Sequence, residues 1–360
     1  MSHIEILVPF ALPPAELAVD LLRELGLPAL AMLLARARRL PTSADNSRDP
    51  DADTHDGFAR SLPHEAWLAH RFGMATALPT CGSPPLAAAR MRMLGMHPEP
   101  GYWFMLQPVH YHIARDHLVL TDLRQLALTD ADARALFAAA VPAFDEAGLT
   151  LCYGTADCWF VRADRHRDLQ TATPDATCGR NIDIWMPKGP AEREWRKLQN
   201  EIQMQWHASD VNQDREIAGK KPVNSLWLWG AATAPLAVQK SGYTDTFNLI
   251  DWMPDGGKNA GRRDRSATAA DVLTAPSKRA LLLVDTLVEP ALGADMSEWL
   301  LRMNALEQCW FEPVLQALKT GALDQCRLIL TNGTAIADVP ISRSSLRKFW
   351  KKPSLSDLLE

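Results

Sequence analysis

The chain has 360 residues, of which 47% are hydrophobic and 22% charged, and its formal net charge is −5 at pH 7. This composition is typical of a globular protein with one large or two moderate domains. The negative charge excludes a general nucleic-acid binder, which needs a concentrated basic surface. No apolar run is long enough to span a bilayer and the N-terminus lacks the pattern of a secretion signal, so we expect a cytoplasmic protein without a membrane segment.

The first hundred residues combine a strand with helical patterns. We expect a strand at 4–10, a helix from about 14 to 39, and helices at 65–72 and 86–94. Between them, residues 41–57 are polar and nearly free of apolar side chains. This composition predicts a flexible connector.

The middle of the chain alternates strands and helices. The expected elements are a strand from Gly101, a helix from Thr129 to Gly148, a hairpin at 149–162, a strand at 182–186, a helix at 190–207 and a strand at 225–229. Thr129 is a good N-cap and Gly148 a good helix stop. The aromatic run at 225–229 predicts a buried strand, and we expect Gly230 to end it where a backbone could approach a ligand.

The last third carries two further strands around a helix. The run RALLLVD at 279–285 is nearly continuous in apolar residues, which suits a strand buried on both faces. Asp295 can cap a helix that runs towards Gly321, and a final strand follows at 326–331. The alternation of strands and helices predicts α/β or α+β layering.

The most informative stretch, HASDVNQDREIAGKKPVNSLWLWG, runs from His207 to Gly230. Its polar residues lead into the apolar strand, so Asn212, Arg215, Lys220 and Asn224 would stand at a strand entrance and could hold an anion. The alternative is a helix, a turn and a core strand whose polar residues only cap and solvate the turn. Spacing alone favours neither interpretation.

This stretch resembles the hpvN…R…Gk.pAN.iWlWG block of archaeal-type, cofactor-independent phosphoglycerate mutases. It is similar also to RpfE-type regulatory proteins, bacterial proteins often labelled phosphoglycerate mutase. The similarity runs from about Gly101 to Trp350. It implies an α/β fold with an alkaline phosphatase-like central sheet and an inserted α+β lobe. The implied domains are an N-terminal part of the core at 1–100, a ligand lobe at 101–230 and a C-terminal part of the core at 231–360.

In the mutases that this chain resembles, two divalent metals held by Asp and His activate a serine nucleophile. The corresponding strand ends here read Val8-Pro9-Phe10, Asp285 without a following His, and Asn332-Gly333-Thr334. Neither Ser61 nor Ser83 has a matching motif around it. The arginines that would grip a phosphoglycerate are also replaced, unless Arg162 substitutes for one of them. We therefore assign no catalytic residue.

Further candidates lie outside the central block. His110 and His112 have the H-x-H spacing of a metal site, although hydrogen-bonded histidines in a loop are the commoner case. Asp183 aligns with the Asp of a family HDI motif, and a structural cap is an equal alternative. The six cysteines contain no CxxC pair and predict neither a zinc site nor a disulfide framework.

These features predict a non-catalytic, cytoplasmic regulatory protein of the RpfE type, a pseudoenzyme that binds a small anionic metabolite or a protein partner and needs no cofactor. The ligand-binding candidates are Asn212, Arg215, Lys220, Asn224, His110 and Asp183, and the weak metal candidates are His110, His112 and Asp285. The resemblance implies a link with the regulation of secreted enzymes and polysaccharide in plant-associated bacteria. The alternative is a metal-dependent phosphoglycerate mutase with rearranged ligands for manganese, zinc or magnesium. A third possibility is an interaction protein whose partner covers a Trp-rich surface.

Overall fold

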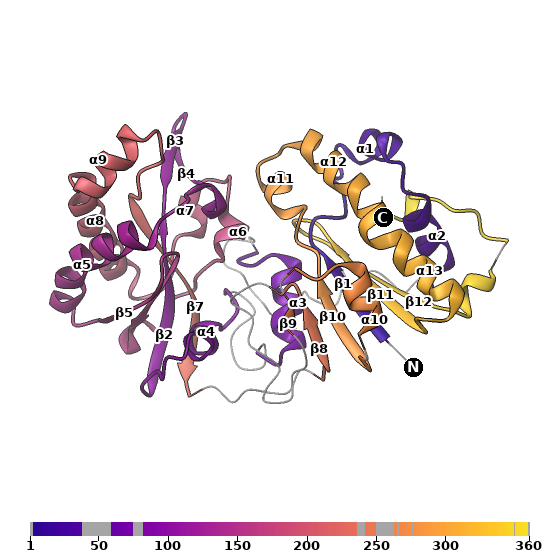
Figure 1. The fold of residues 1–360 in the computed structure, drawn as a ribbon. Helices are drawn as coiled ribbons and strands as arrows, with labels where there is room; N and C mark the ends of the chain where they lie inside the picture. The colour runs from indigo at the N-terminus through magenta and orange to yellow at the C-terminus, as the bar shows by residue number, and fades with distance from the viewer. Residues whose placement is uncertain are drawn as a thin grey trace. The chain divides into compact units, whose positions relative to one another are not determined.

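The computed structural model describes residues 3–37, 59–74, 82–235, 242–249, 263–264, 266–275, 277–348 and 350–358. The chain forms two compact units (Figure 1). Unit 1 comprises Met1–Asp49, Lys240–Asp251 and Asp255–Glu360, and unit 2 comprises Pro50–Gln239 and Trp252–Pro254. Unit 2 thus starts about fifty residues before the predicted lobe. The predicted flexible connector at 41–57 lies outside the described residues.

Unit 1 is built on a six-stranded sheet with the order β12-β11-β1-β10-β8-β9. The strands are β1 (His3–Val8), β8 (Asp245–Phe247), β9 (Arg263–Asp264), β10 (Arg279–Leu283), β11 (Gln325–Thr331) and β12 (Ile336–Ser342). All neighbouring strands are parallel except β12, which runs antiparallel to β11. A central mixed sheet with helices confirms the predicted α/β class.

The helices of unit 1 follow local sequence signals. They are α1 (Ala18–Glu24), α2 (Pro28–Arg36), α10 (Ala269–Thr274), α11 (Val288–Leu292), α12 (Met296–Leu306) and α13 (Glu312–Thr320), and α2 and α13 pack against β12 and β11. Within the described part of the helix predicted at 14–39 there are two helices, α1 and α2, and Pro28 opens α2, where a missing N–H costs no intrahelical hydrogen bond. A π-helical turn at Glu307–Phe311 joins α12 to α13 just before Pro313, and Gly321 ends α13 with φ 86°.

Unit 2 contains an antiparallel sheet with the order β5-β6-β2-β7 and a separate hairpin, β3–β4. The strands are β2 (Gly101–Val109), β3 (Tyr111–Ala114), β4 (His117–Leu120), β5 (Thr150–Thr155), β6 (Cys158–Arg162) and β7 (Ser225–Ala234). Strand β7 continues through Gly230, so the predicted end at this residue is wrong. The glycine has φ 70° and accepts a hydrogen bond from the Leu86 amide, and a Cβ there would lie 2.9 Å from the Met105 side chain. Its backbone approach therefore serves packing.

The helices of unit 2 are α3 (Pro63–Arg71), α4 (Ala87–Met93), α5 (Asp130–Glu146), α6 (Pro174–Thr177), α7 (Ile182–Trp185), α8 (Glu192–His207) and α9 (Asp210–Ile217). The Thr129 side chain caps α5 as predicted, accepting a bond from the Asp132 amide. The strand predicted at 182–186 is wrong, because this run forms α7. Asn181 caps its first turn, and a short apolar run does not by itself distinguish a strand from a buried helix.

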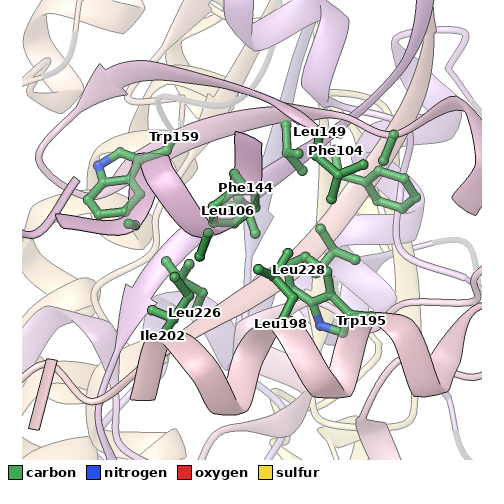
Figure 2. Packing of buried hydrophobic residues seen from close by; sticks show 14 of the residues in the cluster. Phe104, Leu106, Phe144, Leu149, Trp159, Trp195, Leu198, Ile202, Leu226 and Leu228 are labelled. Atoms are coloured by element: carbon green, nitrogen blue, oxygen red, sulfur yellow. The ribbon is translucent and has the colours of Figure 1, made fainter. Parts of the chain in front are cut away.

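The main core of unit 2 lies between its sheet and helices α5 and α8. In Figure 2, strand residues Phe104, Leu106, Trp159, Leu226 and Leu228 surround the same interior as Trp195, Leu198 and Ile202 of α8. The helical residues recur at three- and four-residue intervals, which places them on one buried face. Trp159 and Trp195 therefore serve as packing side chains of this core.

None of the described helices combines the length and the apolar character needed to cross a membrane.

Candidate functional site

The carboxyl ends of parallel strands are where α/β sheets usually hold ligands, and in unit 1 this edge is formed by β11, β1 and β10. After β1 the chain places Phe10 in a left-handed conformation with φ 58°. The Phe10 carbonyl accepts a hydrogen bond from Trp299 Nε1 at 2.8 Å, and its amide donates to Thr331 Oγ1 at 3.4 Å. All three side chains are buried, so the edge beside β1 is filled by packed residues.

The turn after β11 is closed by hydrogen bonds between one of its side chains and its own backbone. Asn332 Oδ1 accepts from the amides of Thr334 and Ala335 at 2.9 and 2.7 Å. Such a turn uses the side-chain oxygen for local structure. The Thr331 carbonyl also accepts from the Leu12 amide at 3.0 Å, which ties this turn to the segment after β1.

Asp285 is the one carboxylate at the three strand ends, and it is exposed after β10. A pair of divalent metals needs several Asp and His ligands. Phe10, Thr331 and Asn332 cannot supply them, so the residues described at this edge do not fit the two-metal centre of the mutases that the sequence resembles. Across the described ranges, no group of three or more His, Cys, Asp or Glu side chains is placed to hold a metal ion.

In unit 2 the predicted block is ordered by Asn212. Its side-chain amide donates to the carbonyls of Trp206 and Val223, both at 2.8 Å, and its oxygen accepts from the Val223 amide at 2.7 Å. The side chain is buried. Asn212 therefore joins α8 and α9 to the approach of β7, and its polar atoms are used in doing so.

Arg215 makes a second internal connection. Its Nε donates to the Lys221 carbonyl at 2.9 Å, one terminal nitrogen donates to the Leu126 carbonyl, and the other lies 3.4 Å from the Asp132 carboxylate. The side chain is only 2% exposed. The guanidinium thus fixes α9 to the loop before α5 and to the start of α5, and Lys220 beside it is exposed.

Asn224 and His110 hold the base of the β3–β4 hairpin. The Asn224 side chain accepts from the Tyr111 amide at 2.7 Å and donates to the Tyr111 carbonyl at 2.8 Å. His110 Nδ1 lies 2.8 Å from the Pro222 carbonyl. Burial lowers the pKa of His110, and the nearby cationic groups lower it further, while the bond to Pro222 opposes them.

Four of the six ligand candidates thus meet at the segment 221–224. Asn224 belongs to it, and Asn212, Arg215 and His110 bond to its backbone. Lys220 adjoins this segment. Asp183 is exposed in the first turn of α7, where its amide donates to the Asn181 side chain, and it bonds to none of the other candidates. Of the metal candidates, His110 and His112 are neighbours in unit 2, whereas Asp285 belongs to unit 1.

Of the three residues considered as replacements for family groups, Arg162 and Ser83 have structural partners. Arg162 pairs with Glu99 at 3.1 Å and Asp164 at 2.9 Å. Ser83 Oγ accepts from the Gly230 amide and lies 2.8 Å from Thr171 Oγ1. Both contacts hold unit 2 together, and neither marks a nucleophile or a phosphate fork.

A buried polar cluster in unit 2 escaped the sequence reasoning. Glu65 accepts from the Leu62 amide and the Thr173 hydroxyl, each at 2.7 Å, and burial, followed by the Asp175 charge, raises its pKa. Burial, followed by the Arg124 charge, lowers the pKa of the adjacent His64 to about 3. An acid in the first helical turn after Pro63 is a common, usually exposed pattern, so nothing in the sequence signals its burial.

No protein-family model and no curated protein matches the sequence. Among solved structures, the chain is similar to a cofactor-independent phosphoglycerate mutase from Thermoplasma acidophilum, with 14% identity and a TM-score of 0.46, covering 100% of this chain and 95% of that one. It is also similar to the PH0037 protein of Pyrococcus horikoshii, with 13% identity and a TM-score of 0.48, covering 94% and 86%. These distant similarities assign the chain to no family.

Proposed function

We propose that this protein is a non-catalytic regulatory protein, a distant relative of cofactor-independent phosphoglycerate mutases of the RpfE type, which binds a small anionic metabolite. The relationship rests on the resemblance of the block at 207–230. In this proposal the central sheet of unit 1 is an alkaline phosphatase-like sheet that no longer carries the metal ligands needed for catalysis.

The observation that carries the proposal is the filled strand-end edge of unit 1. Phe10 and Trp299 are packed and bonded where the resemblance expects metal ligands, and Asn332 closes its own turn. Rearranged ligands would have to come from side chains other than these. Asp285 alone provides too few donors for two metals.

The anion would bind at the α9–β7 segment. Backbone atoms bond to the side chains of Asn212, Arg215 and Asn224. In the proposal these three residues therefore fix the conformation of the segment. Lys220 and Lys221 are exposed on it and can offer their ammonium groups. A fixed backbone that presents two cations is suited to a small phosphate or carboxylate ligand.

Calorimetric titration with 3-phosphoglycerate in the presence of EDTA tests this proposal. We expect binding without metal, weakened on the order of tenfold or more by the double substitution Lys220→Gln and Lys221→Gln, since each tenfold corresponds to about 1.4 kcal/mol. Lys197→Gln, an exposed lysine on α8, is the matched control. Binding that appears only with Mn²⁺ would contradict the proposal. Absence of binding would reject the metabolite and leave a protein partner as the remaining form of the prediction.

A further inference from the structure

The β3–β4 hairpin places histidines on one face. His112 pairs with Val119 and Ala114 pairs with His117, so these four residues share a face of the two-stranded ribbon. The His110 ring stacks near that of His112, with centroids 6.3 Å apart and planes 13° from parallel. The spacing i, i+2 therefore brings two imidazoles to the same side of the chain.

Each ring of this pair is held at Nδ1. His110 Nδ1 lies 2.8 Å from the Pro222 carbonyl, and His112 Nδ1 lies 3.1 Å from Thr121 Oγ1. A carbonyl can only accept, so Nδ1 of His110 carries the proton and the neutral ring has its lone pair on Nε2. The hydrogen bonds of both rings to described residues are made at Nδ1, which leaves each Nε2 without one.

Imidazoles that ligate metals are commonly oriented in this way, with one nitrogen donating to a backbone carbonyl or another oxygen and the other facing the ion. We propose that His110 and His112 form a two-histidine site for a borderline divalent metal ion such as Zn²⁺, with water completing the coordination. This inference does not depend on the proposed function, because the site lies in unit 2 and uses neither lysine of the anion proposal.

Zinc binding requires the two rings to move from the positions they have without metal. Zn²⁺ binds imidazole nitrogen at about 2.0–2.1 Å, which puts the ring centroids of a tetrahedral pair roughly 5 Å apart. The observed centroids are 6.3 Å apart in near-parallel rings, so the rings must come closer and turn towards each other until both Nε2 lone pairs, which lie in the ring planes, point at one ion. Mg²⁺ and Ca²⁺ prefer oxygen ligands and are expected not to bind here.

The charge of Lys221 predicts how a substitution of this lysine would change zinc affinity. Lys221 lies close enough to His110 to lower its pKa, so the same ammonium group opposes a bound cation. The lysine is exposed and its charge is screened, which keeps this opposition modest. Lys221→Gln should therefore tighten Zn²⁺ binding by less than tenfold while it weakens anion binding. The opposite signs separate the two proposals.

Zinc titration by calorimetry tests the site on the untagged full-length chain. We expect one Zn²⁺ bound, with affinity reduced on the order of tenfold or more by either His110→Gln or His112→Gln, the loss of one of two protein ligands. His207→Gln removes an exposed histidine from the end of α8 and is the matched control. Circular dichroism verifies folding, and because His112 is exposed, its variant keeps the test valid if the His110 variant does not fold.

Wild-type affinity in His112→Gln, or an equal loss in His207→Gln, would overturn the assignment. His117→Gln is expected to change the affinity by less than about threefold, because its Nδ1 is held by Asp116 at the hairpin tip and the site needs only two histidines. A larger loss of affinity in His117→Gln would mean that zinc binds at the hairpin tip, and it would also contradict the two-histidine site.

Discussion

The strand-end edge of unit 1 and the α9–β7 segment of unit 2 compare differently with the pattern that the sequence resembles. At the edge, packed residues such as Phe10 lie where that pattern has metal ligands. In the segment, Asn212, Arg215 and Asn224 match the pattern, and every one of them is bonded to backbone. Residues that match a pattern can therefore serve the local structure, and contacts are needed to tell this role from ligand binding.

The largest effect is expected when a packed side chain is removed from the strand-end edge of unit 1. Phe10→Ala should lower the free energy of unfolding by about 3–5 kcal/mol, because it leaves a cavity between packed side chains. Chemical denaturation measures the loss. Leu301→Ala, which truncates a side chain that is 66% exposed on α12, should change it by less than about 0.5 kcal/mol. If Phe10→Ala were as mild as this control, the edge would be a solvated site and not a packed one.

A smaller effect is expected in the polar segment. Asn212→Ala removes three hydrogen bonds and leaves buried backbone groups of Val223 without their partner, which should cost about 1–3 kcal/mol. Gln213→Ala, its exposed neighbour on α9, is the control. An unchanged unfolding free energy in Asn212→Ala would return this side chain to the list of ligand candidates.

The smallest predicted effect concerns the buried acid. The pKa of Glu65 is raised in the folded protein, so its contribution to stability is present at low pH and is lost as pH rises through the folded pKa. The neighbouring His64 is neutral in the folded protein and half protonated at pH 6.5 in the unfolded chain, so its opposite contribution levels off about one pH unit higher and is the same in wild type and variant. Glu65→Gln should therefore flatten the fall in stability above this pH by about 1 kcal/mol or more. Parallel denaturation series at several pH values check this, and an unchanged slope would mean that Glu65 is ionised in the fold.

The sequence predicted most of the elements, because apolar periodicity and caps act locally. Thr129, Asp295 and Gly321 mark helix ends in the structure as expected. The misplaced elements are short or interrupted: α7 carries too few residues for a period, and Pro28 divides a longer helix. Spacing placed the polar block at the strand entrance. It could not show that Arg215 is buried or that Glu65 meets Thr173 from 108 residues away, since both depend on tertiary contacts.

The most direct test of the central claim is an assay for interconversion of 3- and 2-phosphoglycerate with added Mn²⁺, Zn²⁺ or Mg²⁺. The protein should be purified from a mutase-deficient host, beside a mock preparation and an Asp285→Asn variant. We expect no turnover above the mock preparation with any metal, because the strand-end edge lacks the ligands. Metal-dependent turnover that the Asp285 substitution abolishes would contradict this account and identify a working enzyme with rearranged ligands.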